Sequence, residues 1–183
     1  MRVDPKNIEH LSMMIDDVFP TAHGESIHAK NFHLTSSDVY NAIARDYFWL
    51  RPSWWVQFLF NLRKFTGMLF RIDNPDPGQV RGNEIKFAIG ERVLFFTVLA
   101  IDEQKEIVLA NRNKIIESVF SFYLEPLGAF RTRLYNKTKV RFLNIFGQIY
   151  WYLILPFHHL IIESYLNQLK KIAEKKYASQ QAT

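Results

Sequence analysis

Apolar and polar residues alternate along much of the second half of the chain, as they do in β-strands with one buried face. The clearest run is residues 129–142, in which apolar and small side chains alternate with a basic series. Two shorter runs, residues 92–102 and 106–113, flank a turn. Residues 27–34 also alternate and are read as a first strand. We therefore predict an antiparallel β-meander over residues 91–141, preceded by that strand.

The first third of the chain carries helical patterns. Residues 35–48 begin with a Thr-Ser-Ser cap and continue at helical spacing. Residues 51–70 are large and apolar on most sides, so we predict a helix that is deeply buried or covers another element. Residues 1–27 are read as an irregular segment with one short helix. We treat segment 36–70 as a helical insertion in a single domain that spans residues 1–183.

The most apolar stretch, FGQIYWYLILPFHHLII at residues 146–162, approaches the length of a membrane span. It continues, however, into an amphipathic segment whose apolar arc is centred on His158 and whose charges lie opposite. Two histidines and a glutamine would also be costly within a bilayer. We therefore predict a helix over residues 145–177 that packs on the sheet. Pro156 would kink or restart this helix, or would open a separate final helix.

Composition supports one folded domain and excludes several kinds of chemistry. Of the 183 residues, 48% are hydrophobic and 15% are aromatic, which is more bulky apolar volume than a minimal core needs. A cavity, a groove or an oligomer interface would use that excess, and a homodimer is one candidate assembly. The chain has no Cys, which excludes disulfides and thiolate sites. The first residues lack a signal-peptide core, so we predict a cytoplasmic protein.

The formal net charge of +5 raises the question of an anionic partner. Basic residues gather on the predicted outer face of the strand at residues 129–142, namely Arg131, Arg133, Lys137, Lys139 and Arg141. We interpret this face as wet and charged for solubility, and weak contact with an anionic membrane is the alternative. No nucleic-acid motif accompanies the charge, so no specific nucleic-acid partner is expected.

Four segments point to a known family. They read SWWVQFLFNLRKFTG, IGERVLFFTVL, EIVLANRNK and RTRLYNKTKVRFLNIFGQIYWYLILPFHHLIIESYL, in consistent order within residues 36–170. They resemble an uncharacterised bacterial family of unknown function within the helix-grip (SRPBCC) superfamily of START-type lipid-transfer, Bet v 1-like and polyketide-cyclase-like proteins. The most specific positions are Asn144, Gly147, Tyr150, Pro156, Phe157 and His158.

The resemblance implies an α+β helix-grip fold. A curved antiparallel sheet would wrap around the long C-terminal helix, with additional helices in the first third of the chain and an apolar cavity between sheet and helix. One departure concerns a turn that is acidic in the family and is basic and amide-rich here, at residues 111–114. Any role of the family's acids at this turn does not carry over.

His158 is the sharpest candidate for a functional residue. Its place at the centre of the apolar arc directs the ring toward the sheet or cavity, where it could bind a ligand oxygen or act as a general acid or base. The alternative is a structural histidine that is bonded to a backbone carbonyl. His159 falls at the edge of the arc and is expected at the surface or rim. Other candidate ligand-binding residues are Tyr165, Ser118, Phe120, Phe122, Phe130 and Thr132.

Aromatic residues of the second predicted helix, Trp54, Trp55 and Phe58, form a candidate lid or portal over the cavity. The alternative for most of them is ordinary core packing.

We expect no metal site and no cofactor. His23, His28 and His33 are separated by five residues each in strand or loop sequence. The two adjacent histidines of the C-terminal helix diverge by about 100° and cannot easily share a metal. Phosphate-binding loops and dinucleotide fingerprints are absent from the sequence.

These observations predict a protein that binds a small hydrophobic molecule, lipid or polyketide-like, between sheet and helix. One alternative is an enzyme of cyclase or dehydratase type that uses the same cavity with His158 as acid or base. The sequence offers no convincing second acid or base for it. The remaining alternative is a structural or partner-binding protein with a collapsed cavity.

Overall fold

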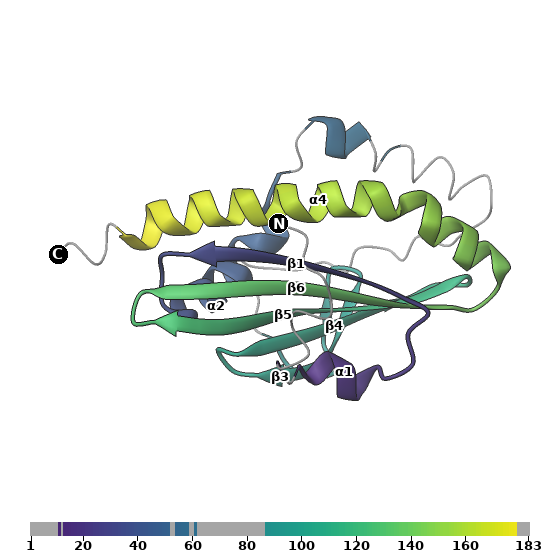
Figure 1. The fold of residues 1–183 in the computed structure, drawn as a ribbon, viewed down its shortest axis with the longest axis horizontal. Coiled ribbons are helices and arrows are strands. Elements are labelled where there is room, and N and C mark those ends of the chain that lie inside the picture. Colours follow the sequence, from purple (N-terminus) through teal and green to yellow (C-terminus); the bar gives the residue numbers. More distant parts are fainter. Residues whose placement is uncertain (1–10, 12, 52–53, 59–60, 62–86, 179–183) are drawn as a thin grey trace.

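The computed structural model describes residues 11, 13–51, 54–58, 61 and 87–178. Its sheet has six antiparallel strands in the order β1-β6-β5-β4-β3-β2. The strands are β1 (Gly24–Phe32), β2 (Arg92–Val93), β3 (Phe96–Asp102), β4 (Glu106–Arg112), β5 (Ile116–Gly128) and β6 (Arg131–Phe142). Strands β2 to β6 follow one another as a meander, and β1 joins at the free edge of β6 (Figure 1). The predicted antiparallel sheet is confirmed, although its first strand begins at residue 24 rather than 27.

The helical elements are α1 (Met14–Val18), α2 (Ser36–Arg45), the 3₁₀ turn η2 (Tyr47–Trp49) and α4 (Ile145–Ala178). The Oγ1 atom of Thr35 accepts a hydrogen bond from the Asp38 amide at 3.1 Å, so the predicted cap does begin α2. Residues 54–58 are also helical, and the rest of the predicted helix and loop between residues 51 and 84 lies largely outside the described residues. Segment 1–27, which was read as irregular with one short helix, contains the helix α1 and, beyond that prediction, the start of β1.

Helix α4 runs without interruption for 34 residues and includes Pro156 in its interior. Proline lacks an amide hydrogen and crowds the preceding turn, so within a helix it causes a kink or a break. Figure 1 shows α4 as one curved helix that lies along the sheet. Of the predicted alternatives, a single helix is therefore correct and a separate final helix is not.

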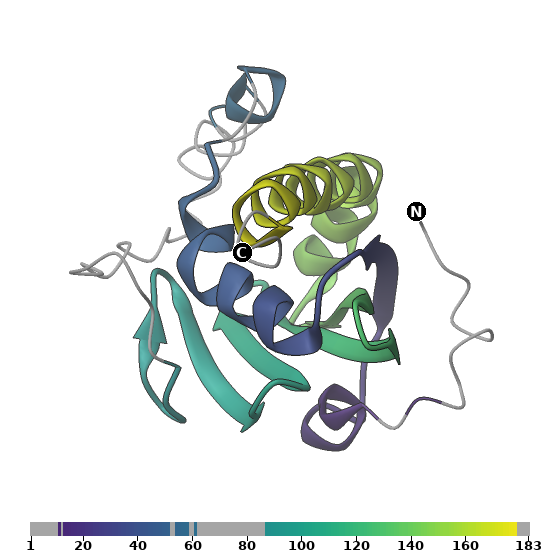
Figure 2. The same ribbon diagram turned by 90° about the vertical axis from the view of Figure 1, so that its left-hand side faces the viewer.

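By length and composition alone, α4 could cross a membrane, because an 18-residue stretch within Ile145–Tyr177 has a mean hydropathy of 1.3. In the structure this helix packs against β1, β6 and α2 instead. The sheet, the long C-terminal helix and the helices of the first third together form a helix-grip fold, seen end-on in Figure 2.

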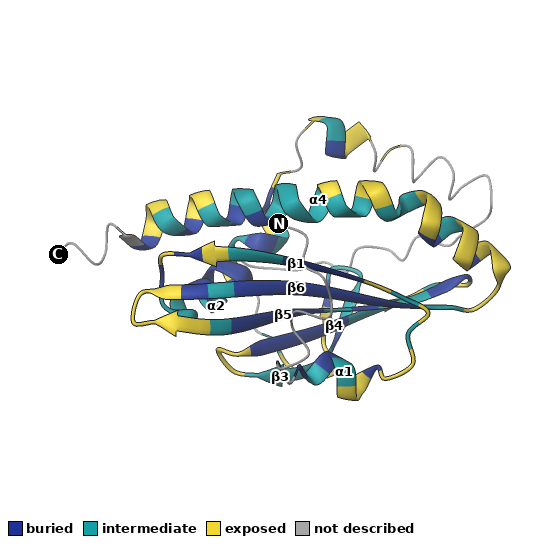
Figure 3. Ribbon diagram, viewed as in Figure 1, coloured by how far each residue is buried: buried dark blue, intermediate teal, exposed yellow. Residues whose placement is uncertain are grey.

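The two largest of three apolar cores lie on opposite faces of the sheet, and a third, around Trp151, lies under the start of α4. The larger core fills the space between the sheet, α2 and α4 with residues such as Phe122, Leu134 and Leu166. The smaller core lies under α1 and includes Ile15 and Tyr135. Because both faces of β6 are covered, the run from 134 to 140 is buried at every position despite its alternating sequence (Figure 3).

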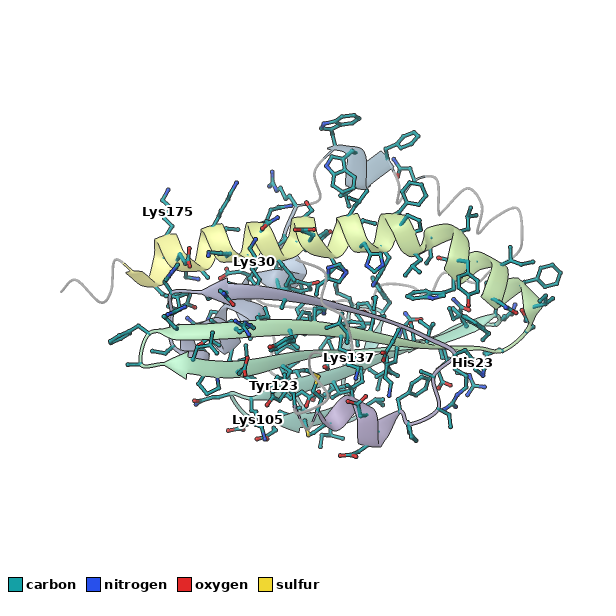
Figure 4. The ribbon with its side chains drawn as sticks, in the orientation of Figure 1. His23, Lys30, Lys105, Tyr123, Lys137 and Lys175 are labelled. Atoms are coloured by element: carbon teal, nitrogen blue, oxygen red, sulfur yellow. The ribbon has the colours of Figure 1, made fainter. Side chains whose placement is uncertain are left out.

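The predicted wet, basic face of β6 is wrong for its central residues. The side chains of Lys137 and Lys139 are only 9% and 8% exposed. Asp16 of α1 lies over them, with its carboxylate 2.6 Å from Lys137 Nζ and 2.9 Å from Lys139 Nζ. Partial burial would raise the pKa of Asp16, but the hydrogen bonds and charges of the two lysines outweigh it and lower that pKa. Helix α1 thus lies over these two lysines, and Asp16 offsets part of their positive charge. Figure 4 shows Lys137 near α1.

Candidate functional site

A ladder of polar side chains crosses the sheet face under α4. Ser26 and His28 of β1 face this side, and their registered partners on β6 are Thr138 and Asn136. All four residues are at most 5% exposed. Alternation along each strand places these even-numbered residues toward α4, while Ile27 between them enters the opposite core. The ladder is therefore a buried polar strip in the helix–sheet interface.

The two histidines of α4 hydrogen-bond to the β1 side of this ladder. His158 Nε2 lies 3.0 Å from Ser26 Oγ, and His159 Nδ1 lies 2.9 Å from His28 Nε2. The ring of Trp151 closes the group, with its centroid 5.5 Å from that of His158. Two successive residues of one helix can both reach β1 because α4 lies along this strand (Figure 1). His159, which was expected at the surface or rim, is a half-buried partner in this group.

His158 is held in its neutral form. Burial, followed by the proximity of His28 and His159, lowers the pKa of His158 to about 3. At neutral pH its imidazole therefore carries no charge and has one N–H donor and one acceptor. If His158 were purely structural, we expected its partner to be a backbone carbonyl. The observed partner is the Ser26 hydroxyl.

Aromatic rings continue the interface from the polar ladder toward β3. Phe120 and Phe122 of β5 are the registered neighbours of the two β6 ladder residues. The Phe122 ring lies 4.6 Å from that of Tyr47, which in turn lies 5.8 Å from the ring of Tyr165 on α4. Phe120 and Tyr165 are only half-buried, although both face the interior of the fold. Burial raises the pKa of the Tyr165 phenol, which therefore stays protonated.

Asn136 contributes a polar atom that lacks a partner. Its Nδ2 donates to the Ser121 carbonyl at 3.3 Å, and the residue is 1% exposed. Within the described part of the chain, its Oδ1 is buried and accepts no hydrogen bond. Buried polar groups are nearly always satisfied, so this acceptor calls for an explanation in terms of strain or of a bound molecule.

Other predicted site residues lie elsewhere in the fold. Thr132 is fully buried at the end of β6, where its hydroxyl donates to the Leu34 carbonyl at 2.9 Å. Ser118 lies two residues before Phe120 in β5, on the same side of the sheet. Its hydroxyl donates a hydrogen bond to the Asn111 carbonyl at 3.3 Å. Phe130 is 58% exposed in the turn between β5 and β6. It cannot line the interface because the strand alternation ends before this turn.

The predicted lid residues belong to the short helical segment 54–58. Trp54 and Phe58 are 84% and 62% exposed, whereas Trp55 is half-buried. The core-packing alternative therefore fails for the first two, and Val56 is the fully buried residue of this segment.

Within the residues that the structure describes, no group of three or more His, Asp or Glu side chains is arranged to hold a metal ion. His33 lies apart from the other histidines, 3.1 Å from the Glu174 carboxylate. His23 accepts a hydrogen bond from the Phe142 amide at 2.8 Å and lines an open depression of about 480 Å³ where β6 meets α4. This depression is separate from the ladder and is shallow.

Sequence reasoning missed the ladder residues Ser26, His28 and Asn136. The sequence signal that could have found two of them is the alternation of Ser26 and His28 with apolar neighbours in β1. A polar residue on the inward side of an edge strand needs a hydrogen-bond partner from the covering helix. Asn136 stood within a basic run and gave no comparable signal.

The fold and this interface define a helix-grip protein with a polar ladder under its C-terminal helix. The chain belongs to the family described as "Protein of unknown function (DUF2867)", which matches residues 23–165. The expected membership of an uncharacterised family is thereby confirmed.

Solved structures share the fold at low identity. A putative uncharacterised protein from Rhizobium leguminosarum is similar at 14% identity and a TM-score of 0.53, covering 84% of this chain and 95% of its own. A protein from Arthrobacter aurescens is similar at 12% identity and a TM-score of 0.51, covering 82% and 86%. A norcoclaurine synthase from Thalictrum is more distant, at 10% identity and a TM-score of 0.46, covering 83% and 94%. No curated protein matches the chain.

Proposed function

We propose that this protein binds a small hydrophobic molecule, lipid or polyketide-like, that presents a hydrogen-bond donor to the polar ladder beneath α4. The observation that carries this proposal is the buried, unpaired Oδ1 of Asn136. Leaving such an acceptor unsatisfied costs roughly 1–3 kcal/mol. A ligand hydroxyl or amine that donates a hydrogen bond to this oxygen would recover that free energy. Such a ligand would account for the presence of a buried, unpaired amide oxygen.

The surroundings of Asn136 suit an amphipathic ligand. Phe122 is its registered neighbour on β5, and the half-buried ring of Phe120 follows two residues away on the same face. Small-molecule sites combine apolar walls with a few fixed polar groups, and this interface has both. Neutral His158, already bonded to Ser26, adds a polar group without the cost of a buried charge. Tyr165 provides a further hydroxyl from α4.

This assignment would place the family among START-type, Bet v 1-like and polyketide-cyclase-like binding proteins.

The enzymatic alternative is less well supported by the geometry. A general base works best when its pKa lies near the operating pH, whereas the pKa of His158 is about 3. The neighbouring groups, His28, His159 and Ser26, do not include a carboxylate that would raise it. Binding without turnover is therefore the function that we propose.

Native mass spectrometry of freshly purified protein tests the proposal. We expect an adduct of small, apolar mass that is released on denaturation. The Phe120→Trp variant should lose this adduct because the larger ring would compete with a ligand bound beside the ladder. Phe130→Trp makes the same substitution in the exposed β5–β6 turn and should retain the adduct.

Clean apoprotein from the wild type, or equal adduct in both variants, would contradict the proposal. The first result would favour the alternative of a structural or partner-binding protein without a ligand.

A further inference from the structure

The outer side of α4 carries a long exposed apolar row along its N-terminal half. We call this row the outer stripe, and its members are 42–66% exposed. They are Ile145, Phe146, Ile149, Tyr152, Leu153, Phe157 and Leu160. Their spacing of three, four and seven residues puts them on one side of the helix, opposite Trp151, which is buried against the sheet. Figure 3 shows the exposed residues following the outer surface of this half of α4.

A helix on the surface of a soluble protein normally turns a polar face to water. Here no Asp, Glu, Lys or Arg occurs between Arg141 and Glu163, so the first half of α4 carries no formal charge and its outer side is apolar. Only 11% of the residues in the most apolar 18-residue stretch of α4 are buried. Contiguous exposed apolar surface of this kind marks a site of interaction.

A second exposed apolar group lies on the same side of the molecule. Residues 54–58 project beyond α4 on the side away from the sheet in both Figure 1 and Figure 2. Trp54 and Phe58 of this segment are 84% and 62% exposed. Tryptophan and tyrosine are enriched where proteins meet the boundary between lipid and water, because their rings are apolar with one polar edge. Tyr152 of the outer stripe is of the same kind.

Positive charge continues the line of the outer stripe. At about 100° per residue, Lys171 and Lys175 fall on the same side of α4 as Leu153 and Phe157. Glu163 and Glu174 fall nearer the line of Ile145, and the charge of Glu174 is offset by Lys170 and His33. Both lysines are exposed, and Figure 4 shows Lys175 pointing away from the sheet. Among the residues that the structure describes, neither lysine forms a salt bridge, and the chain carries a net charge of +5. An apolar row that leads into lysines is the pattern of a helix that lies in a membrane interface.

We propose that the outer stripe docks onto the surface of an anionic phospholipid bilayer. The apolar side chains enter the boundary between headgroups and acyl chains, and Lys171 and Lys175 contact the headgroup phosphates. The curvature of α4 around the sheet makes its outer side a convex ridge (Figure 1). Such a ridge can sink into a fluid bilayer without a complementary groove, whereas a protein partner would have to supply one. This inference does not depend on the proposed ligand site.

Flotation with vesicles tests the docking surface. Full-length protein is mixed with vesicles of phosphatidylcholine alone, or of phosphatidylcholine with phosphatidylglycerol, and the bound fraction is measured. We expect binding to the anionic vesicles that weakens as salt is added, and weaker binding to the neutral ones. Ile149→Glu with Leu153→Glu should reduce binding by about tenfold or more, because charged groups resist entry into the apolar boundary.

The matched control is Leu127→Glu with Phe130→Glu. It adds the same two charges at exposed apolar positions, one near the end of β5 and one in the β5–β6 turn, which are 37% and 58% exposed. This control should bind within about twofold of the wild type if the outer stripe is the contact. Lys171→Ser with Lys175→Ser should weaken anionic binding by about fivefold per lysine and reduce its salt dependence.

Circular dichroism and thermal melting establish that each variant is folded. Failure of the wild type to float with either vesicle would overturn the inference, as would equal loss in the stripe and control variants. Sedimentation of the free protein adds a further check. A dimer that dissociates only in the stripe variant would assign the surface to a second copy of the chain and would also overturn the inference.

Discussion

Acid should weaken this fold through His158, whose imidazole is buried without a carboxylate partner. The unfolded chain takes up a proton at this residue near pH 6.5, whereas burial and the two neighbouring histidines lower the folded-state pKa to about 3. The folded state therefore binds fewer protons than the unfolded state between these values. The contribution of His158 is complete above pH 6.5 and is lost as the pH falls toward 3.

The expected magnitude follows from the difference between the two pKa values. Each pH unit below 6.5 removes about 1.4 kcal/mol from the free energy of unfolding. At pH 4.5 the accumulated loss is roughly 2.5 kcal/mol, and it changes little if the folded-state pKa is one unit higher. Such a loss is a large fraction of the usual stability of a domain and is within the range of a standard denaturation experiment.

Urea denaturation at several pH values between 7.5 and 4.5 measures this effect. Carboxylates such as Asp16 also contribute to the pH dependence, so the informative quantity is the difference between wild type and His158→Gln. Glutamine can still bond to Ser26 but does not titrate. The wild type should lose roughly 2.5 kcal/mol more than this variant over the range. His33→Gln, at a side chain that is 72% exposed, is the control for removing a histidine.

Equal pH dependence of wild type and His158→Gln would show that His158 is not held neutral by the fold. NMR of the ring protons gives an independent check, because the His158 signal should not shift between pH 8 and pH 5. A midpoint within this range would refute the reasoning and would return His158 to consideration as an acid or base.

Three further predictions concern single residues. Asn136→Leu should change the free energy of unfolding by no more than about 1 kcal/mol, because the unpaired acceptor and one hydrogen bond are lost together. Ligand retention in native mass spectra should nevertheless fall. An adduct retained by this variant would rule out a role of Asn136 in binding. Asp16→Asn should cost about 1–3 kcal/mol in urea denaturation, since two nearly buried lysines lose their counter-charge; an unchanged midpoint would mean that water already compensates them. Gly147→Ala should lower the melting temperature by several degrees, because a Cβ there would overlap the Ile115 carbonyl at the start of α4; a melting curve like that of the wild type would show that the loop yields easily.

Much of the fold was predictable because its elements have strong local signals. The β-strand of residues 129–142, the Thr35 cap and the amphipathic second half of α4 all follow from spacing alone. The covering of β6 by α1 was not predictable in this way. A basic series looks the same whether it meets water or a folded-back segment, and the decisive partner, Asp16, lies over 100 residues away in sequence.

The candidate site was predictable in part. His158, Phe120 and Phe122 all face the helix–sheet interface, as expected from their places in regular apolar patterns. Ser26 and His28 were missed because their function depends on which residues of α4 lie opposite them, and that is set by tertiary packing. Phe130 was assigned to the interface by alternation alone, which does not show where a strand ends and its turn begins.

The pairing of β1 with β6 has a consequence for how the chain is made. Every registered pair between these strands joins residues separated by roughly 100 positions or more, so this contact carries the largest loop-closure cost in the sheet. On the ribosome, β1 leaves the exit tunnel first and cannot pair until β6 has been synthesised, by which time β3, β4 and β5 can already have formed their local hairpins. We therefore expect the first strand of the sequence to be the last to join the sheet, together with the contacts that α4 makes with β1.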